Sequence, residues 1–206
     1  MSGTASLFDR LADVGGYAVD LTLTEGLAPG EVLDGVELEA CRFEGAVLEG
    51  AVLRGCTFTD CVFTGCNLNR VDLDGSRFVD CRFLDCTALA VTWTRAAAAA
   101  LSVRPWDFER CRLDLASFQE AAIAGSRVVD CSLREADFGS ADVQRVDFAG
   151  SDLGAAVFVG TDLRGASLVG ATGYGLDPPQ HRVRGLRVEA TAAAGLLSAM
   201  GLVVEG

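Results

Sequence analysis

The stretch at residues 51–70, AVLRGCTFTDCVFTGCNLNR, repeats one five-residue pattern four times. Each unit has a large apolar residue at its centre, a small apolar residue two positions earlier, and mostly polar residues at the other three positions. The four centres are Leu53, Phe58, Phe63 and Leu68. An internal period determines the architecture of the whole chain, and the same spacing continues on both sides of this stretch.

The row of centres extends over 28 consecutive positions without an insertion or a deletion in the pattern. It weakens only between residues 88 and 103. The row consists of Leu33, Leu38, Phe43, Leu48, Leu53, Phe58, Phe63, Leu68, Leu73, Phe78, Phe83, Ala88, Trp93, Ala98, Val103, Phe108, Leu113, Phe118, Ile123, Val128, Leu133, Phe138, Val143, Phe148, Leu153, Phe158, Leu163 and Leu168.

A second row lies two residues before each centre and contains no charged residue from Val36 to Ala166. An unpaired carboxylate inside a protein is costly, so the absence of charge from two of the five columns indicates that both are buried. Two residues of every five then point inward, and three face water. All eight cysteines belong to the second row: Cys41, Cys56, Cys61, Cys66, Cys81, Cys86, Cys111 and Cys131.

The identities of the centres predict a coil of four repeats, because residues 20 apart are alike. One column then contains Leu38, Phe58, Phe78, Ala98, Phe118, Phe138 and Phe158, and its neighbour contains Leu33, Leu53, Leu73, Trp93, Leu113, Leu133 and Leu153. The predicted fold is all-β: a right-handed quadrilateral β-helix with a C-terminal α-helix. Its seven coils at roughly 4.8 Å each give a column about 34 Å long.

The pattern divides the chain into three parts: an N-terminal cap at residues 1–30, the repeat array at 31–172, and a C-terminal partial coil and helix at 173–206. The array is irregular at residues 88–107, where Trp93 replaces a leucine, Ala98 replaces a phenylalanine and Trp106 occupies the small-residue row. We expect the chain to bulge outward around Trp106 as a short lateral loop.

The C-terminal part carries a large apolar load for the end of a chain. A helix is predicted from Ala190 to Met200. Its exposed apolar side chains either fold back as a cap or meet a second copy of the chain across a twofold axis, and we expect a homodimer. The predicted dimerisation residues are Leu196, Leu197, Met200, Leu202, Val203 and Val204.

The charge balance restricts the class of partner. The formal net charge is −12, from 29 acidic and 17 basic residues, which opposes direct binding to nucleic acid or to an anionic membrane. It favours basic partners, or protein surfaces that normally bind nucleic acid. No secretory signal and no apolar stretch of membrane-spanning length is visible, so we expect a cytoplasmic protein with reduced cysteines.

The cysteines are the first candidates for chemistry. Thiolates bind zinc, but a tetrahedral site needs ligands that converge, whereas stacked cysteines point the same way. No CxxC motif occurs, and the sole histidine, His181, offers little as a general base for a nucleophile. Free cysteine packs as a small apolar residue. We therefore expect no enzyme activity, no catalytic residue, no metal and no cofactor.

An acidic run is the second candidate. It occupies the position just before successive centres in the last two predicted coils. Aspartate at this position also forms hydrogen bonds with nearby backbone in turns, which explains much of the pattern. The alternative is an acidic surface that binds a partner, formed by Asp137, Asp142, Asp147, Asp152 and Asp162.

The A-D-F, V-D-F, S-D-L and T-D-L units of residues 136–163 resemble the pentapeptide-repeat superfamily, and the likeness covers residues 31–170. Two further stretches, DCTALAVTWT at 85–94 and GLLSAMGL at 195–202, resemble its topoisomerase-protecting branch, which includes quinolone-resistance and albicidin-resistance proteins. The likeness of the Trp93 segment is closer to the albicidin-resistance type.

This resemblance implies a homodimeric rod joined through the C-terminal helices that binds DNA gyrase, mimics duplex DNA and protects the enzyme from topoisomerase poisons. Arginines are mixed among the acids on the outward faces, so the surface lacks the uniform negative charge of duplex DNA. A local contact through Arg95, Arg104 and Trp106 is therefore an alternative basis for protection. A repeat scaffold that binds another protein partner is the alternative function.

Overall fold

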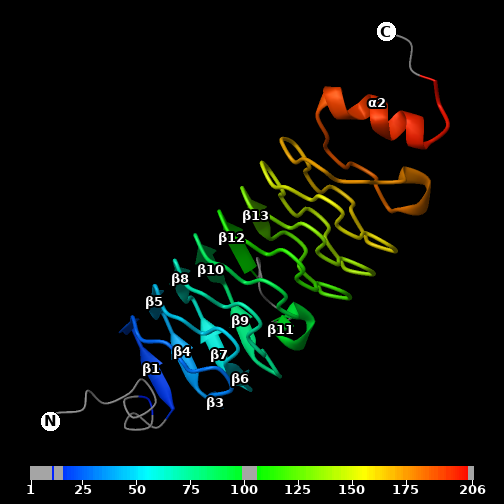
Figure 1. The fold of residues 1–206 in the computed structure, drawn as a ribbon. Coiled ribbons are helices and arrows are strands. Elements are labelled where there is room, and N and C mark those ends of the chain that lie inside the picture. The colour runs from blue at the N-terminus through cyan, green and yellow to red at the C-terminus, as the bar shows by residue number, and fades with distance from the viewer. Residues whose placement is uncertain (1–10, 12–15, 99–105, 204–206) are drawn as a thin grey trace, which may run out of the picture.

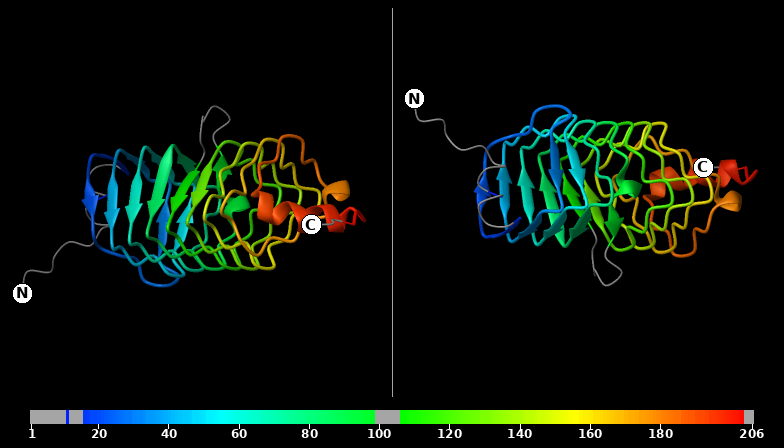
Figure 2. Two further views of the ribbon diagram at one scale, coloured as in Figure 1. Left: turned by 90° about the horizontal axis from the view of Figure 1, so that it is seen from above. Right: turned by 90° about the horizontal axis from the view of Figure 1, so that it is seen from below.

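The computed structural model describes Leu11, residues 16–98 and residues 106–203. These residues form a mostly-β solenoid that ends in one helix (Figure 1). The two views of Figure 2 show that the coils stack along one axis, with residues 16–23 (blue) and residues 190–203 (red) at opposite ends of the stack. Every strand pair is parallel, because each strand pairs with the same part of the next coil.

Regular strands form about five turns, in parallel sheets ordered β1-β4-β7-β9-β11, β13-β12-β10-β8-β5-β2 and β3-β6. Single parallel bridges continue the stack to Arg187, so regular strands account for fewer turns than the seven coils predicted. The strands are β1 (Tyr17–Val19), β2 (Thr22–Leu23), β3 (Val32–Asp34), β4 (Glu37–Glu39), β5 (Arg42–Glu44), β6 (Val52–Arg54), β7 (Thr57–Thr59), β8 (Val62–Thr64), β9 (Arg77–Val79), β10 (Cys81–Leu84), β11 (Ala97–Ala98), β12 (Trp106–Glu109) and β13 (Arg127–Val129).

The predicted register of 20 residues is confirmed over most of the chain. Phe43 pairs with Phe63, and Phe63 pairs with Phe83. Adjacent rings lie face to face, with centroids 4.4 and 4.8 Å apart. Four such rows of pairs run along the solenoid, which gives each coil four faces. Every member of the two predicted inward rows whose burial the structure describes is buried, and the apolar members form one continuous core.

The register changes once, and there the predicted columns are wrong. Arg82 pairs with Asp107 and Thr92 is bridged to Ser117, so this coil contains 25 residues instead of 20. Phe118 consequently stacks on Trp93, with ring centroids 6.1 Å apart, and not on Ala98. The five-residue period continues unbroken through the extra repeat, so the pattern alone does not reveal it.

The turns explain where cysteine occurs. In one kind of turn the amide of the small-row residue donates to the carbonyl of the preceding centre, as Ala116 does to Leu113 at 3.1 Å. In the described residues no cysteine amide makes this bond. A side chain of the next coil accepts instead: Ser76 Oγ from the Cys56 amide at 3.0 Å, and Cys86 Sγ from the Cys66 amide at 3.3 Å.

The thiols also satisfy backbone carbonyls of the preceding coil. The Cys61 thiol lies 3.4 Å from the Leu38 carbonyl, 23 residues earlier, and the Cys111 thiol lies 3.2 Å from the Phe83 carbonyl, 28 residues earlier, because of the longer coil. Ser76 Oγ makes the equivalent bond to the Leu53 carbonyl at 2.9 Å. This column thus selects small side chains that donate and accept hydrogen bonds within an apolar core.

The two ends differ. β1 and β2 pair with β4 and β5, so residues 17–23 of the predicted N-terminal cap are themselves stacked on the repeat array. Residues 1–10 and 12–15 of that cap lie outside the described residues. The 3-10 helix η1 (Trp93–Arg95) interrupts the stack near its middle. At the C-terminal end η2 (Pro178–Gln180) interrupts the coil, and α2 (Ala190–Ala199) confirms the predicted helix.

Candidate protein-binding surfaces

The structure does not gather the predicted acidic run on one surface. Asp142 and Asp162 are bridged to each other on one face, whereas Asp137, Asp147 and Asp152 each lie in a different one of the other three rows. The five carboxylates therefore surround the solenoid. A partner that contacts one face meets at most two of them.

These carboxylates also point toward their own backbone. In each case Oδ1 accepts a hydrogen bond from the amide two residues later. The distances are 2.8 Å for Asp137, 3.0 Å for Asp142, 3.2 Å for Asp147, 2.9 Å for Asp152 and 3.2 Å for Asp162. Local turn bonding, the alternative weighed from the sequence, accounts for aspartate at this position.

Arginines neutralise part of the run. Arg134 lies 2.9 Å from Asp152. Asp162, with only 11% of its side chain exposed, is held by Arg164 at 2.6 Å and by Arg182 at 3.5 Å. The hydrogen bonds from Arg164 lower the pKa of Asp162 to about 2, against the opposing effect of burial.

Asp162→Asn should destabilise the fold by about 1–2 kcal/mol at neutral pH, because it removes charge-assisted bonds from a nearly buried group. The folded pKa is depressed, so this stability is present above the unfolded value near about 4 and is lost as pH falls toward about 2. Urea unfolding of both proteins at pH 7 and at pH 2 measures it. An equal difference at both pH values would contradict the ion-pair account.

Both halves of the described chain are acidic, and the N-terminal half more strongly so. Residues 16–98 contain 13 acidic and 6 basic side chains, a net charge of −7, whereas residues 106–203 contain 13 and 9, a net charge of −4. Exposed acids in the first half include Asp20 and Asp34, whose side chains are 75% and 65% exposed and lie 3.2 and 4.0 Å from the guanidinium groups of Arg42 and Arg54. The sequence already contains this asymmetry, because both halves have 13 acids but the first has six arginines and the second has nine.

The predicted mid-chain contact site is only partly described. Trp106, expected on an outward bulge, is 1% exposed: it lies in β12, pairs with Cys81 and packs against Trp93 with ring centroids 5.5 Å apart. Its prediction as a partner-contacting side chain is wrong, because the core of the longer coil needs its volume. Arg95 ends η1, and Arg104 lies outside the described residues.

The C-terminal end exposes apolar side chains, and most of the predicted dimerisation residues are among them. Leu197 is 38% exposed, Met200 49%, Leu202 53% and Val203 87%. Leu196 is partly buried against the core, and Val204 lies outside the described residues. Val159, on the last complete coil, adds an exposed side chain at 70% that the sequence reasoning missed.

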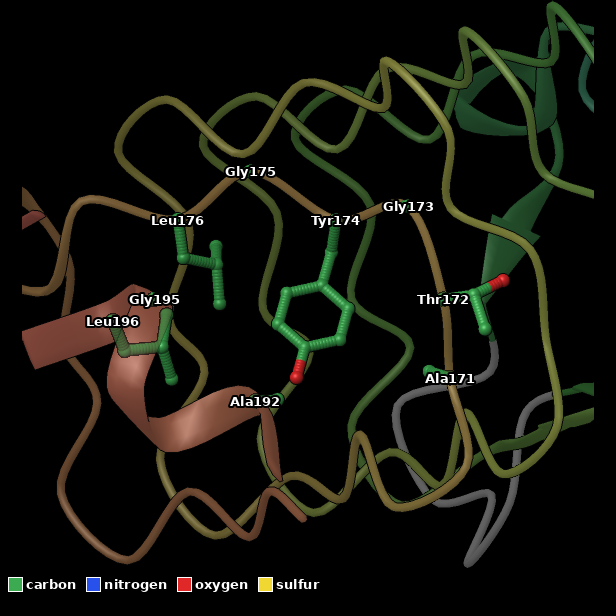
Figure 3. A pocket seen from close by; sticks show the side chains of 9 residues that line it. All are labelled: Ala171, Thr172, Gly173, Tyr174, Gly175, Leu176, Ala192, Gly195 and Leu196. Carbon is green, nitrogen blue, oxygen red and sulfur yellow. The ribbon is translucent and has the colours of Figure 1, made fainter. Parts of the chain in front are cut away.

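A groove between α2 and the last coil was also missed. It measures ≈ 580 Å³ and is shown in Figure 3 with its lining residues labelled. The lining is mostly apolar, and glycine, alanine and leucine supply most of it. Tyr174 projects into the space enclosed by the coil, and its hydroxyl is buried without a hydrogen-bond partner among the described residues.

No feature of the described residues suggests metal or redox chemistry. All eight cysteines are buried and free, and burial raises the pKa of the Cys41 and Cys56 thiols. Within the described ranges no group of three or more histidine, cysteine or acidic residues has the geometry to hold a metal ion. No described helix combines the length and the apolar character needed to cross a membrane.

Comparisons with known proteins agree with the repeat. The model of the pentapeptide repeat region matches residues 36–104, and the model of pentapeptide repeats (8 copies) matches residues 111–150 and 141–172. No curated protein matches the sequence.

Among solved structures, a trypsin-treated variant of QnrB1, a plasmid-mediated fluoroquinolone resistance protein, superposes with a TM-score of 0.64 at 18% identity, over 92% of this chain and 100% of that one. Full-length QnrB1 gives 0.54 at 19% identity, over 90% of this chain and 100% of that one. At this identity the likeness concerns the fold. From the matched repeats and the solenoid that they build, this chain is a pentapeptide-repeat protein.

Proposed function

We propose that this chain forms a right-handed, non-enzymatic rod that binds DNA gyrase in place of duplex DNA and protects it from topoisomerase poisons. The observation that carries the proposal is a narrow acidic solenoid with a net charge of −12 and an apolar C-terminal end. Its resemblance to QnrB1 over nearly the full length of both chains supports this proposal, because QnrB1 confers fluoroquinolone resistance.

The dimensions fit the proposed mimicry. The longest row of stacked residues runs from Thr22 to Arg187 in eight steps. At about 4.8 Å a step the solenoid is about 38 Å long. Two copies joined end to end then give a rod of about 77 Å, which equals roughly 22 base pairs at 3.4 Å each.

The charge distribution refines the mimicry. In an end-to-end dimer the two N-terminal halves, each with a net charge of −7, lie at the outer ends, and the less acidic halves lie at the centre. Gyrase contacts in this proposal are therefore strongest toward the ends of the rod. The local contact through Arg95 and Arg104 that the sequence suggests is a second route to binding, and Arg104 lies outside the described residues.

Leu197→Asp should abolish the proposed homodimer. The exposed Leu197 side chain would be buried between two copies, and a carboxylate there loses its hydration without gaining a partner. Light scattering should give twice the monomer mass for the unmodified chain and the monomer mass for the variant. Thr191→Asp, at an exposed position about 120° around the same helix from Leu197, is the matched control. An unchanged mass for Leu197→Asp would contradict this interface.

Binding to gyrase is tested by competition with DNA. A labelled duplex bound to purified gyrase should be displaced by this protein, and the displacement should weaken as salt is raised. The alternative function is a repeat scaffold for a different protein partner, which the mixture of arginines with the acids favours. Affinity capture that recovers one other protein, together with no displacement of DNA from gyrase, would support that alternative.

A further inference from the structure

The C-terminal end of the solenoid reverses the charge of the chain. The net charge of −4 over residues 106–203 divides into two unequal parts. Residues 106–162 contain five basic and 11 acidic side chains, a net charge of −6, whereas residues 163–203 contain four and two, a net charge of +2. The second part includes η2 and α2, drawn orange and red in Figure 1. The proposed contact with gyrase rests on the acidic coils, so it leaves this positive charge unexplained.

Five exposed arginines lie on successive coils here and are called the basic end: Arg145, Arg164, Arg182, Arg184 and Arg187. The Arg145 amide donates to the Arg164 carbonyl of the next coil at 3.0 Å. Arg182 is bridged to Asp162 one coil further on, on the same face, and Arg187 lies on the neighbouring face. At about 4.8 Å a coil, the five side chains begin within about 10 Å of one another along the axis.

Three of these arginines have no acidic partner. Arg145, Arg184 and Arg187 make no ion pair with a carboxylate of the described residues, in contrast to Arg164 and Arg182. Like charges on neighbouring strands destabilise a sheet, so the isolated chain gains nothing from this arrangement. A positively charged cluster at one end of an otherwise acidic rod fits an acidic partner.

A polar groove of ≈ 510 Å³ opens among the arginines. Its lining includes two arginines of the basic end, two glutamines, Gln144 and Gln180, and two aspartates, Asp142 and Asp162. Asp142 Oδ1 accepts from the Gln144 amide at 3.0 Å, and Asp162 is held by the two arginines. Arg164 binds Asp162 through Nε and Nη2, so its Nη1 group is left to donate to a ligand. The groove therefore offers guanidinium and amide donors to an incoming anion.

An extended acidic peptide fits this surface better than a nucleic acid does. Carboxylates on alternate residues of a strand lie roughly 6.6 Å apart on one side, so two or more of them meet the basic end at once. Arginine pairs with a carboxylate through two parallel hydrogen bonds. A duplex that reached the groove would also approach residues 106–162, whose net charge of −6 repels phosphates.

We propose that the basic end binds an extended acidic segment of a partner protein. Arg184 and Arg187 pair with carboxylates of the segment, and the polar groove receives one of its acidic side chains. This contact is separate from the acidic coils that are proposed to bind gyrase, and it does not depend on gyrase being the partner.

Fluorescence anisotropy with a labelled peptide of alternating glutamate and threonine tests the contact. The peptide should bind the full chain, and the dissociation constant should rise with salt. Arg187→Glu should raise the dissociation constant by about tenfold or more, because repulsion replaces a charge-assisted bond. Arg127→Glu is the matched control: Arg127 is exposed in the same row as Arg187, three coils earlier, and its reversal should leave binding unchanged.

A second variant should change the affinity in the opposite direction. Asp162→Asn releases Arg164 and Arg182 from their ion pairs, so it should lower the dissociation constant of the glutamate peptide several-fold. The same variant is expected to be less stable in urea, and partial unfolding would weaken binding. Tighter binding by a less stable protein therefore cannot come from an effect on folding.

The remaining outcomes would overturn the proposal. No binding of the glutamate peptide, equal binding of a peptide with glutamine in place of glutamate, or equal affinities for Arg187→Glu and Arg127→Glu would each contradict a charge-specific site at the basic end. A labelled DNA duplex that binds more tightly than the peptide would show that the occupant is a phosphate backbone instead. Each of these results leaves the gyrase proposal standing, which is tested separately by displacement of DNA from the enzyme.

Discussion

Phe118→Ala should destabilise the solenoid by about 3–5 kcal/mol, because it opens a cavity in a continuous stack of rings. Phe118 is 1% exposed and lies between Trp93 and Phe138, with ring centroids 6.1 and 5.0 Å away. Denaturant unfolding followed by circular dichroism measures the loss. Leu115→Ala, in the preceding repeat at a position 57% exposed, should cost little.

The same residue tests the 25-residue coil. A double-mutant cycle between Trp93 and Phe118 should give a coupling energy of about 0.5–1.5 kcal/mol, because the rings are in contact. If the coil instead had the regular 20-residue register, Phe118 would stack on Ala98 and the cycle with Trp93 would be close to additive. Additivity would therefore contradict the structure at this point.

Cys61→Asp should cost about 4 kcal/mol at pH 7. Cys61 is fully buried, with its thiol against the Leu38 carbonyl, so an aspartate there stays protonated in the folded chain. Neutralising a carboxyl of normal pKa about 3.9 at pH 7 costs about 1.4 kcal/mol per pH unit. The folded pKa is raised, so the penalty grows with pH above about 4 and shrinks below it.

Cys61→Ser is the matched control for this substitution. Serine already occupies the equivalent position at Ser76, where its hydroxyl makes the same hydrogen bond to a carbonyl of the preceding coil. We expect Cys61→Ser to change stability by less than about 1 kcal/mol. If the serine and aspartate variants were equally unstable at pH 7, the cysteine column would have a role other than packing and hydrogen bonding.

The sequence predicts most of the solenoid, because each buried position repeats at a fixed spacing and few folds satisfy that period. The burial of both inward rows and the 20-residue register follow from it, whereas α2 is predicted separately from the composition of the C-terminal part. The longer coil escapes prediction since one extra repeat keeps the period. Trp106 is much larger than the other members of the small-residue row, so an outward position was expected, yet the longer coil has room for it inside.

The candidate surfaces are less predictable for a different reason. Side chains in the three outward columns are selected both for turn geometry and for partners, and aspartate serves both. The carboxylates of the acidic run accept hydrogen bonds from their own turns, so fewer of their oxygens are free to bind a partner than the residue type suggests. The groove at Tyr174 depends on how α2 packs on the last coil, which no local period encodes.

Rescue of gyrase supercoiling from a poison tests the central claim most directly. Purified gyrase, relaxed plasmid and a fluoroquinolone or an albicidin-like inhibitor are combined with increasing amounts of this protein. We predict that supercoiling is restored at low protein concentrations and that Leu197→Asp, as a monomer, restores it poorly. Unchanged inhibition by every poison, with native protein at concentrations that form the dimer, would contradict the proposed function.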